Sequence, residues 1–165
     1  MKILVITLTS FVAAGILLPN AGQVVFGAAT TTAKVGDTVK VGITATQVDS
    51  GLSQLSISIP YLPSILEFSG VEGEGLEATT AGGTTYAEVD VKWTGSLPAG
   101  SSTHLGYVLF TVKRASPTGY RGTGTNASAL DEAGAQIASV ETVPSEAVVQ
   151  FIARPLRLLL DLLVE

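Results

Sequence analysis

The sequence contains no cysteine, one histidine and few charged residues, which make up 14% of the chain. Without cysteine, a disulfide framework and a thiolate metal site are both excluded. The single His104 leaves no histidine set for zinc. The Gly-x-Ser-x-Gly turn that carries the serine of many hydrolases is also missing. We therefore expect a protein that is not an enzyme, with no catalytic residues, no metal site and no cofactor.

The charge balance bears on possible partners. The net charge is −5, and the nine basic residues are scattered, with Lys113-Arg114 as the one adjacent pair. A nucleic-acid surface needs clustered lysine and arginine, so no nucleic-acid partner is expected. The acids between Glu67 and Glu77 and at Asp131-Glu132 lack the Asp-x-Asp-x-Asp-Gly spacing of a calcium loop. We expect solvated acids there, with loop calcium and a carboxylate pair as alternatives.

The N-terminus has the features of an export signal. Lys2 supplies a positive charge, Ile3–Leu18 is nearly all apolar, and Pro19-Asn20-Ala21 ends the run. This order predicts a cleaved signal peptide within residues 1–29, cut after Ala21 or after Ala29. The alternative is a retained membrane anchor, although the run is at the short edge of what spans a bilayer. Either way, we expect a secreted or cell-surface protein whose only membrane contact would be an uncleaved N-terminus.

Alternating apolar and polar residues indicate half-buried strands in the body of the chain. The pattern occupies Thr38–Val48, Leu52–Ile59 and Thr84–Thr94, and it places Trp93 on an apolar face, in the core. In the segment His104–Val112, one face carries Leu105, Tyr107 and Leu109 and the other carries Val108, Phe110 and Val112. A strand that is apolar on both faces is expected to be central and covered on both sides. Such short strands, separated by regular turn signals, favour a sandwich or a barrel.

Other segments carry weaker signals. Pro117-Thr118-Gly119 predicts a turn, and the glycine-rich Arg121–Thr125 predicts a strand with turn residues. Asn126-Ala127-Ser128 is a formal N-glycosylation sequon. Glu146–Ala153 is expected to be the last strand. The leucine-rich tail 154–165 predicts a short helix that packs on the sandwich or on a neighbouring chain.

Several motifs, taken in order, resemble the cohesin domain, the receptor module of cellulosome scaffolds. Each motif is weak alone, but their order and spacing are moderately specific over residues 30–153. The resemblance implies an all-β fold: a single antiparallel β-sandwich with jelly-roll topology and about nine strands. Together with the termini, the expected organisation is an N-terminal signal helix within residues 1–29, a sandwich over residues 30–153 and a tail, 154–165, that forms a short helix. The matching residues are Val35-Gly36-Asp37-Thr38-Val39, Gly51-Leu52, Tyr61 to Glu67, Val71-Glu72-Gly73, Leu105 to Lys113 with Ala115 and Gly119, and Asp131 to Gly134.

The same resemblance implies a binding face. Cohesins often present Asn and Asp on the outward side of the strand before the Tyr-Asp-Pro motif, and the corresponding positions here are Gln54 and Ser56. The Asp of that motif is Leu62 in this chain. Short polar side chains on a rigid sheet lose little entropy on docking, and tyrosine is a favoured anchor of interfaces. The predicted partner-binding residues are Gln54, Ser56, Ser58, Tyr86 and Glu88.

The predicted function is therefore non-covalent docking of a protein partner, either a dockerin-like module or a neighbour on the cell surface. A carbohydrate-binding module with polysaccharide as its ligand is one alternative, because it shares the sandwich architecture. A structural subunit of a surface filament or coat is the other.

Overall fold

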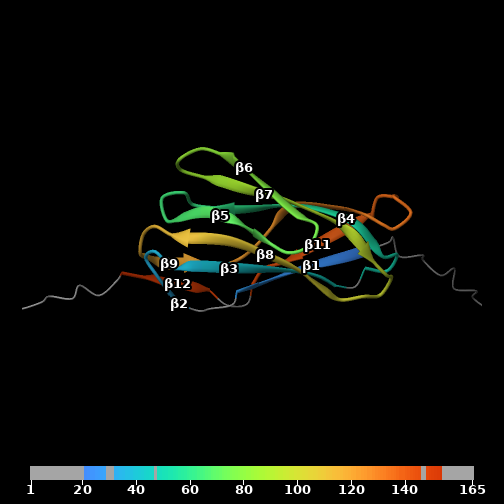
Figure 1. The fold of residues 1–165 in the computed structure, drawn as a ribbon, viewed down its shortest axis with the longest axis horizontal. Coiled ribbons are helices and arrows are strands. Elements are labelled where there is room, and N and C mark those ends of the chain that lie inside the picture. Colours follow the sequence, from blue (N-terminus) through green and yellow to red (C-terminus); the bar gives the residue numbers. More distant parts are fainter. Residues whose placement is uncertain (1–20, 29–31, 47, 146–147, 154–165) are drawn as a thin grey trace, which may run out of the picture.

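The computed structural model describes residues 21–28, 32–46, 48–145 and 148–153 (Figure 1). The signal helix expected before Ala21 and the helix expected after Ala153 lie outside these residues. The described part contains strands and turns but no helix, and hence no helix that could cross a membrane. Its twelve strands are β1 (Ala21–Ala28), β2 (Thr32–Lys34), β3 (Thr38–Thr46), β4 (Leu52–Tyr61), β5 (Leu66–Glu72), β6 (Leu76–Gly82), β7 (Ala87–Leu97), β8 (Thr103–Val112), β9 (Ser116–Tyr120), β10 (Thr125–Leu130), β11 (Ser139–Val143) and β12 (Val149–Ile152).

The strands form two main sheets and a smaller third one (Figure 1). The five-stranded sheet has the order β11-β1-β3-β8-β5, and the four-stranded sheet has the order β10-β4-β7-β6. The three-stranded sheet, β2-β12-β9, lies at one end of the molecule. The all-β prediction is therefore confirmed.

The core lies between the apolar faces of the main sheets. In β3, β4 and β7 the alternation found in the sequence selects the buried side chains, as predicted, and Trp93 is 6% exposed. Period-two burial leaves the intervening polar residues on the outer faces. The buried residues of these strands are Val39, Val41, Ile43, Ala45, Leu52, Leu55, Ile57, Ile59, Ala87, Val89, Val91 and Trp93.

Several details of the predicted fold were wrong. The described chain has twelve strands instead of about nine, and it is not purely antiparallel, because β1 pairs with β11 and β12 with β2 in parallel. The expected turn at Pro117–Gly119 lies inside β9. Arg121–Gly124 is not in a strand, and β10 begins only at Thr125. The parallel pairs join strands that are distant in sequence, and local sequence patterns do not reveal such pairing.

Strand β8 is central, as predicted, since it lies between β3 and β5. It is not covered on both sides, however. A register shift next to Gly106 turns Leu105 into the core with Val108 and Phe110. Tyr107 and Leu109 remain on the outer face and are only half-buried.

Residues assigned from sequence to the N-terminal segment belong to the sandwich. Val24 and Phe26 of β1 are each 2% exposed, and β1 pairs along its length with β3. The residues of β1 therefore contribute to the sheet, although they precede the division drawn at residue 30. Their apolar, small-residue composition is similar to that of the end of a signal peptide.

Candidate functional site

The outer face of the four-stranded sheet is built from aligned polar side chains. Ser56 of β4 pairs with Lys92 of β7, which pairs with Glu77 of β6. In the next row Ser58 pairs with Asp90, which pairs in turn with Thr79 on β6. Strand β10 completes both rows, because Ser128 lies opposite Ser56 and Thr125 lies opposite Ser58. The result is a continuous polar surface across four strands, called here the β4–β7 face.

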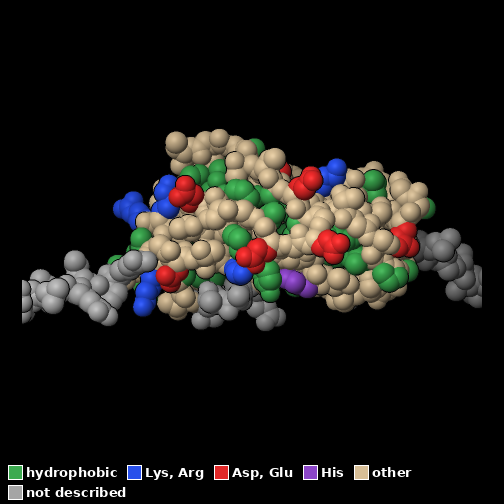
Figure 2. Space-filling model, in the orientation of Figure 1, with side chains coloured by type: hydrophobic (Ala, Val, Ile, Leu, Met, Phe, Trp, Pro, Cys, Tyr) green, Lys and Arg blue, Asp and Glu red, His purple; other side chains and the backbone are tan. Residues whose placement is uncertain are grey.

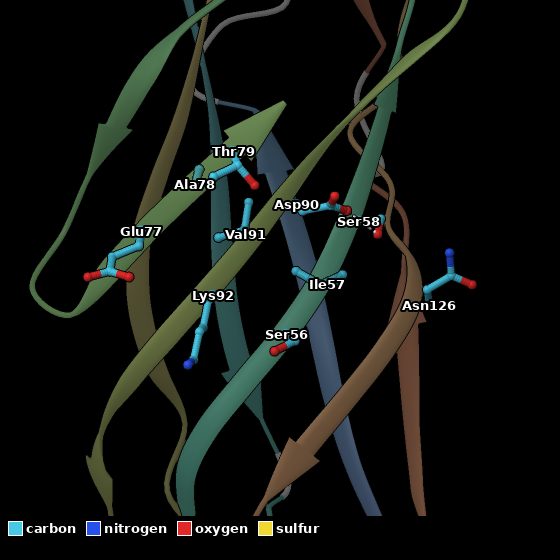
Figure 3. A pocket seen from close by; sticks show the side chains of 10 residues that line it. All are labelled: Ser56, Ile57, Ser58, Glu77, Ala78, Thr79, Asp90, Val91, Lys92 and Asn126. Carbon is cyan, nitrogen blue, oxygen red and sulfur yellow. Dashed lines mark hydrogen bonds between the residues drawn. The ribbon is translucent and has the colours of Figure 1, made fainter. Parts of the chain in front are cut away.

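Part of this face is hollowed into an open depression of about 360 Å³. Figure 3 shows its lining side chains, which come from β6, β7, β4 and β10. Asn126 borders it at the β10 bulge, where its φ of 53° is the one positive φ of a non-glycine residue in the described ranges. Asn is among the residues that tolerate this conformation, so the bulge holds an exposed amide at the edge of the depression.

The five predicted binding residues lie on neighbouring strands of this sheet. Gln54, Ser56 and Ser58 are half-buried on the outer side of β4. Glu88 is on the adjoining part of β7, opposite Pro60, and Tyr86 directly precedes β7 with 50% of its surface exposed. The chain therefore brings these residues to one surface, and whether that surface binds a partner remains a prediction.

Hydrogen bonds engage three of these side chains, Ser58, Tyr86 and Glu88. The Ser58 hydroxyl donates to Asp90 Oδ1 at 2.6 Å, and the Tyr86 hydroxyl donates to Glu88 Oε1 at 2.7 Å. The bond to Glu88 raises the pKa of Tyr86, because it stabilises the protonated phenol beside a carboxylate. Tyr86 is thus a neutral, exposed ring that is hydrogen-bonded to Glu88 at the margin of the face.

Sequence reasoning did not assign Glu77, Thr79, Asp90, Lys92 or Asn126 to the binding surface. The alternation of the sequence does place Asp90 and Lys92 on the outer side of their strand. It carries no information on which strands lie next to β7, however, so the contribution of β6 and β10 was not accessible. Together Glu77, Glu88 and Asp90 set three carboxylates against the single ammonium of Lys92, and the face is therefore acidic.

The opposite sheet carries a different set of groups. His104 Nδ1 lies 3.3 Å from Thr44 Oγ1, and its ring centroid is 4.5 Å from that of Tyr107. Lys40 lies over the Tyr107 ring at 5.6 Å and pairs with Glu72. In Figure 2 acidic and basic side chains are interspersed, and the histidine (purple) lies midway along the long axis, toward the lower edge of the view. Among the described residues no group of three or more His, Asp or Glu side chains is placed to hold a metal ion.

Comparison with solved structures places this architecture among cohesin modules. The chain matches a cohesin module of a family 33 glycoside hydrolase from Clostridium perfringens with a TM-score of 0.63 and 13% identity, covering 81% of this chain and 98% of that one. It matches the Coh-OlpC–Doc435 complex of Clostridium thermocellum with a TM-score of 0.57 and 13% identity, over 81% and 95% of the two chains. It also matches the Coh-OlpA–Doc918 complex of the same organism with a TM-score of 0.57 and 12% identity, over 81% and 100%. At these identities the likeness shows a shared fold.

The sequence itself defines the family. The family model described as "Cohesin domain" matches residues 22–150, which is most of the chain. The chain therefore belongs to the cohesin family, as its motifs indicated. No curated protein matches it significantly. The match begins at residue 22, in agreement with the inclusion of β1 in the sandwich.

Proposed function

We propose that this protein is a non-catalytic docking module whose β4–β7 face binds a dockerin-type module non-covalently. The observation that carries the proposal is the pair of polar rows through Ser56–Lys92 and Ser58–Asp90, with Tyr86 at their margin. Family membership supports it, and so do the two similar Clostridium thermocellum structures, which are described as cohesin–dockerin complexes.

The chemistry of the face favours a protein ligand with basic groups. Short serine and threonine side chains offer hydrogen bonds at little cost in rotamer entropy, and the rigid sheet keeps them in place. The excess of carboxylates attracts a partner surface that presents lysine or arginine, which speeds association and fixes orientation. Tyr86 supplies the exposed aromatic ring that interface hot spots favour.

The proposal includes a site of action outside the cytoplasm. The positively charged and then apolar N-terminus, residues 1–18, supports export, although it lies outside the described residues. The absence of cysteine means that the fold needs no oxidising compartment, so it is compatible with either side of a membrane. Fractionation of the source cells with an antibody to the sandwich tests this part separately.

The binding proposal is tested by titrating the full chain with a panel of dockerin modules in a calorimeter. Ser56→Arg places a long cation at the centre of the face and should weaken binding at least tenfold. The control is Thr38→Arg, at an exposed position on the other main sheet, which should leave the affinity unchanged. Equal affinities for both variants, or no binding of any dockerin by the parent chain, would show that the face does not have this function.

A further inference from the structure

A second depression lies at the end of the sandwich where β4 ends and β9 meets β12. Its volume is about 180 Å³, and its walls are mainly apolar and aromatic. This is below the range of about 300–1,000 Å³ typical of small-molecule sites, so it fits side chains better than a metabolite. It is lined chiefly by Tyr61, Leu62, Ile65, Tyr86, Tyr120 and Phe151 and is called here the tyrosine pocket.

The tyrosine pocket leaves apolar surface in contact with water. Three large apolar side chains in the described ranges are exposed, namely Leu62 (46%), Tyr86 (50%) and Ile152 (42%). Two of the three, Leu62 and Tyr86, line the pocket. A concentration of exposed apolar groups at one place is a feature of a surface that another segment covers.

The pocket wall is neutral except for one cation. The Tyr120 hydroxyl donates to the Pro60 carbonyl at 3.2 Å, and burial raises the pKa of Tyr120, so this phenol stays uncharged. Arg121 also lines the pocket. Within the described ranges the one ion pair is Lys40–Glu72, so no described carboxylate pairs with the guanidinium of Arg121. An occupant with apolar side chains and one acidic group would match the pocket.

The sequence that follows β12 is rich in apolar residues and contains acidic groups. Residues 154–165, outside the described residues, contain six leucines, a valine, two acids (Asp161 and Glu165) and two arginines (Arg154 and Arg157). They begin three residues after Phe151, at the end of the sandwich that carries the pocket. Since each extended residue spans about 3.5 Å, the leucines from Leu156 onward can reach the pocket. Attachment to the same chain gives them a local concentration on the order of millimolar, without a second molecule.

We propose that the leucine-rich segment 156–163 of the same chain docks into the tyrosine pocket, with Asp161 facing Arg121. The segment thereby covers Leu62 and part of Tyr86. The proposal concerns the end of the sandwich and shares Tyr86 with the margin of the β4–β7 face. Its test does not require a dockerin, so the two proposals can fail separately.

The absence of native cysteine makes disulfide trapping a clean test. In the full chain, Leu62→Cys is combined with Leu159→Cys, and disulfide formation in mild oxidant is followed by non-reducing electrophoresis. The matched control combines Gln150→Cys with Leu159→Cys. Gln150 is exposed on β12, closer in sequence to the tail, and does not line the pocket.

A docked tail should form the intramolecular disulfide with Cys at 62 at least tenfold faster than with Cys at 150. Asp161→Arg should slow disulfide formation at position 62, and adding Arg121→Asp should restore the rate. If the tail were only tethered and not docked, neither substitution would change that rate. Equal trapping rates at the two positions would overturn the proposal. Disulfide-linked dimers as the main product would also overturn it, since they would place the tail of a second copy in the pocket.

Discussion

Phe110 connects the core to the walls of the tyrosine pocket, and its removal should be among the costliest single changes in the sandwich. The side chain is 0% exposed. Its ring centroid lies 5.2 Å from Tyr61, 5.8 Å from Tyr120 and 6.3 Å from Phe68, all at tilted or edge-on angles. Replacing a buried Phe by Ala costs about 3–5 kcal/mol, and each favourable ring pair adds about 0.5–1.5 kcal/mol beyond area burial. The measured Phe-to-Ala range already includes lost ring contacts, so the three ring contacts of Phe110 place it at the upper end of that range. We therefore expect Phe110→Ala to lower the free energy of unfolding by about 4–5 kcal/mol.

Urea unfolding followed by fluorescence gives the measurement, because Trp93 is the only tryptophan and lies in the core. With a slope of about 2 kcal/mol per molar urea, the midpoint should fall by about 2 M. Phe110→Leu is the control, because it keeps most of the volume and should cost about 1.5 kcal/mol or less. If the Ala variant loses less than about 2 kcal/mol, or if Ala and Leu cost the same, the ring cluster does not contribute as described.

Three further predictions concern single groups. Burial raises the pKa of Tyr120. At a pH above the ordinary tyrosine pKa, the Tyr120 hydroxyl therefore keeps its proton in the folded chain and loses it in the unfolded chain. Thermal stability should therefore fall as pH rises beyond about 10, by at most about 1.4 kcal/mol per pH unit from this group, and Tyr120→Phe should flatten that slope in melts from about pH 9 to 11. Gly106→Ala should cost at least about 2 kcal/mol in urea unfolding, because φ is 144° and a Cβ would lie 2.2 Å from the Glu72 carbonyl oxygen, whereas Gly27→Ala, with nothing within 4 Å, should be nearly neutral. Glu72→Gln removes the ion pair between Lys40 and Glu72, whose two side chains are 41% and 51% exposed, respectively. The free energy of unfolding should fall by less than about 1 kcal/mol at low salt and by almost nothing at about 1 M salt. A larger loss that does not depend on salt would contradict this.

The sequence predicted best what depends on local alternation. From Leu55 to Ile59 in β4 and from Ala87 to Trp93 in β7 the buried side chains alternate without interruption. In these stretches both the buried set and the outward residues Ser56 and Lys92 follow from period two. In β8 the bulge at Gly106 changes the phase of the alternation, and a strict period-two reading turned Leu105 to the wrong face. A bulge depends on the partner strand as much as on its own residues.

The sequence did not predict which strands pair when they lie far apart along the chain. The neighbours of β7 contribute Glu77 and Thr79 to the β4–β7 face, yet nothing in the Glu-rich segment around residues 72–77 specifies its partner strand. The parallel pairs of β1 and β12 were missed for the same reason, since each joins segments about a hundred residues apart. The tyrosine pocket likewise combines β4, β9 and β12, which no single motif spans.

The positions of β1 and β12 determine how the sandwich would bear a pulling force. β1 begins near one end of the long axis and β12 ends near the other, and the strands run roughly along that axis (Figure 1). Tension applied between Ala21 and Ile152 therefore acts along β1, which is bonded to β3 on one side and to β11 on the other. These ladders would be loaded in shear, so their hydrogen bonds would have to break together instead of opening one at a time.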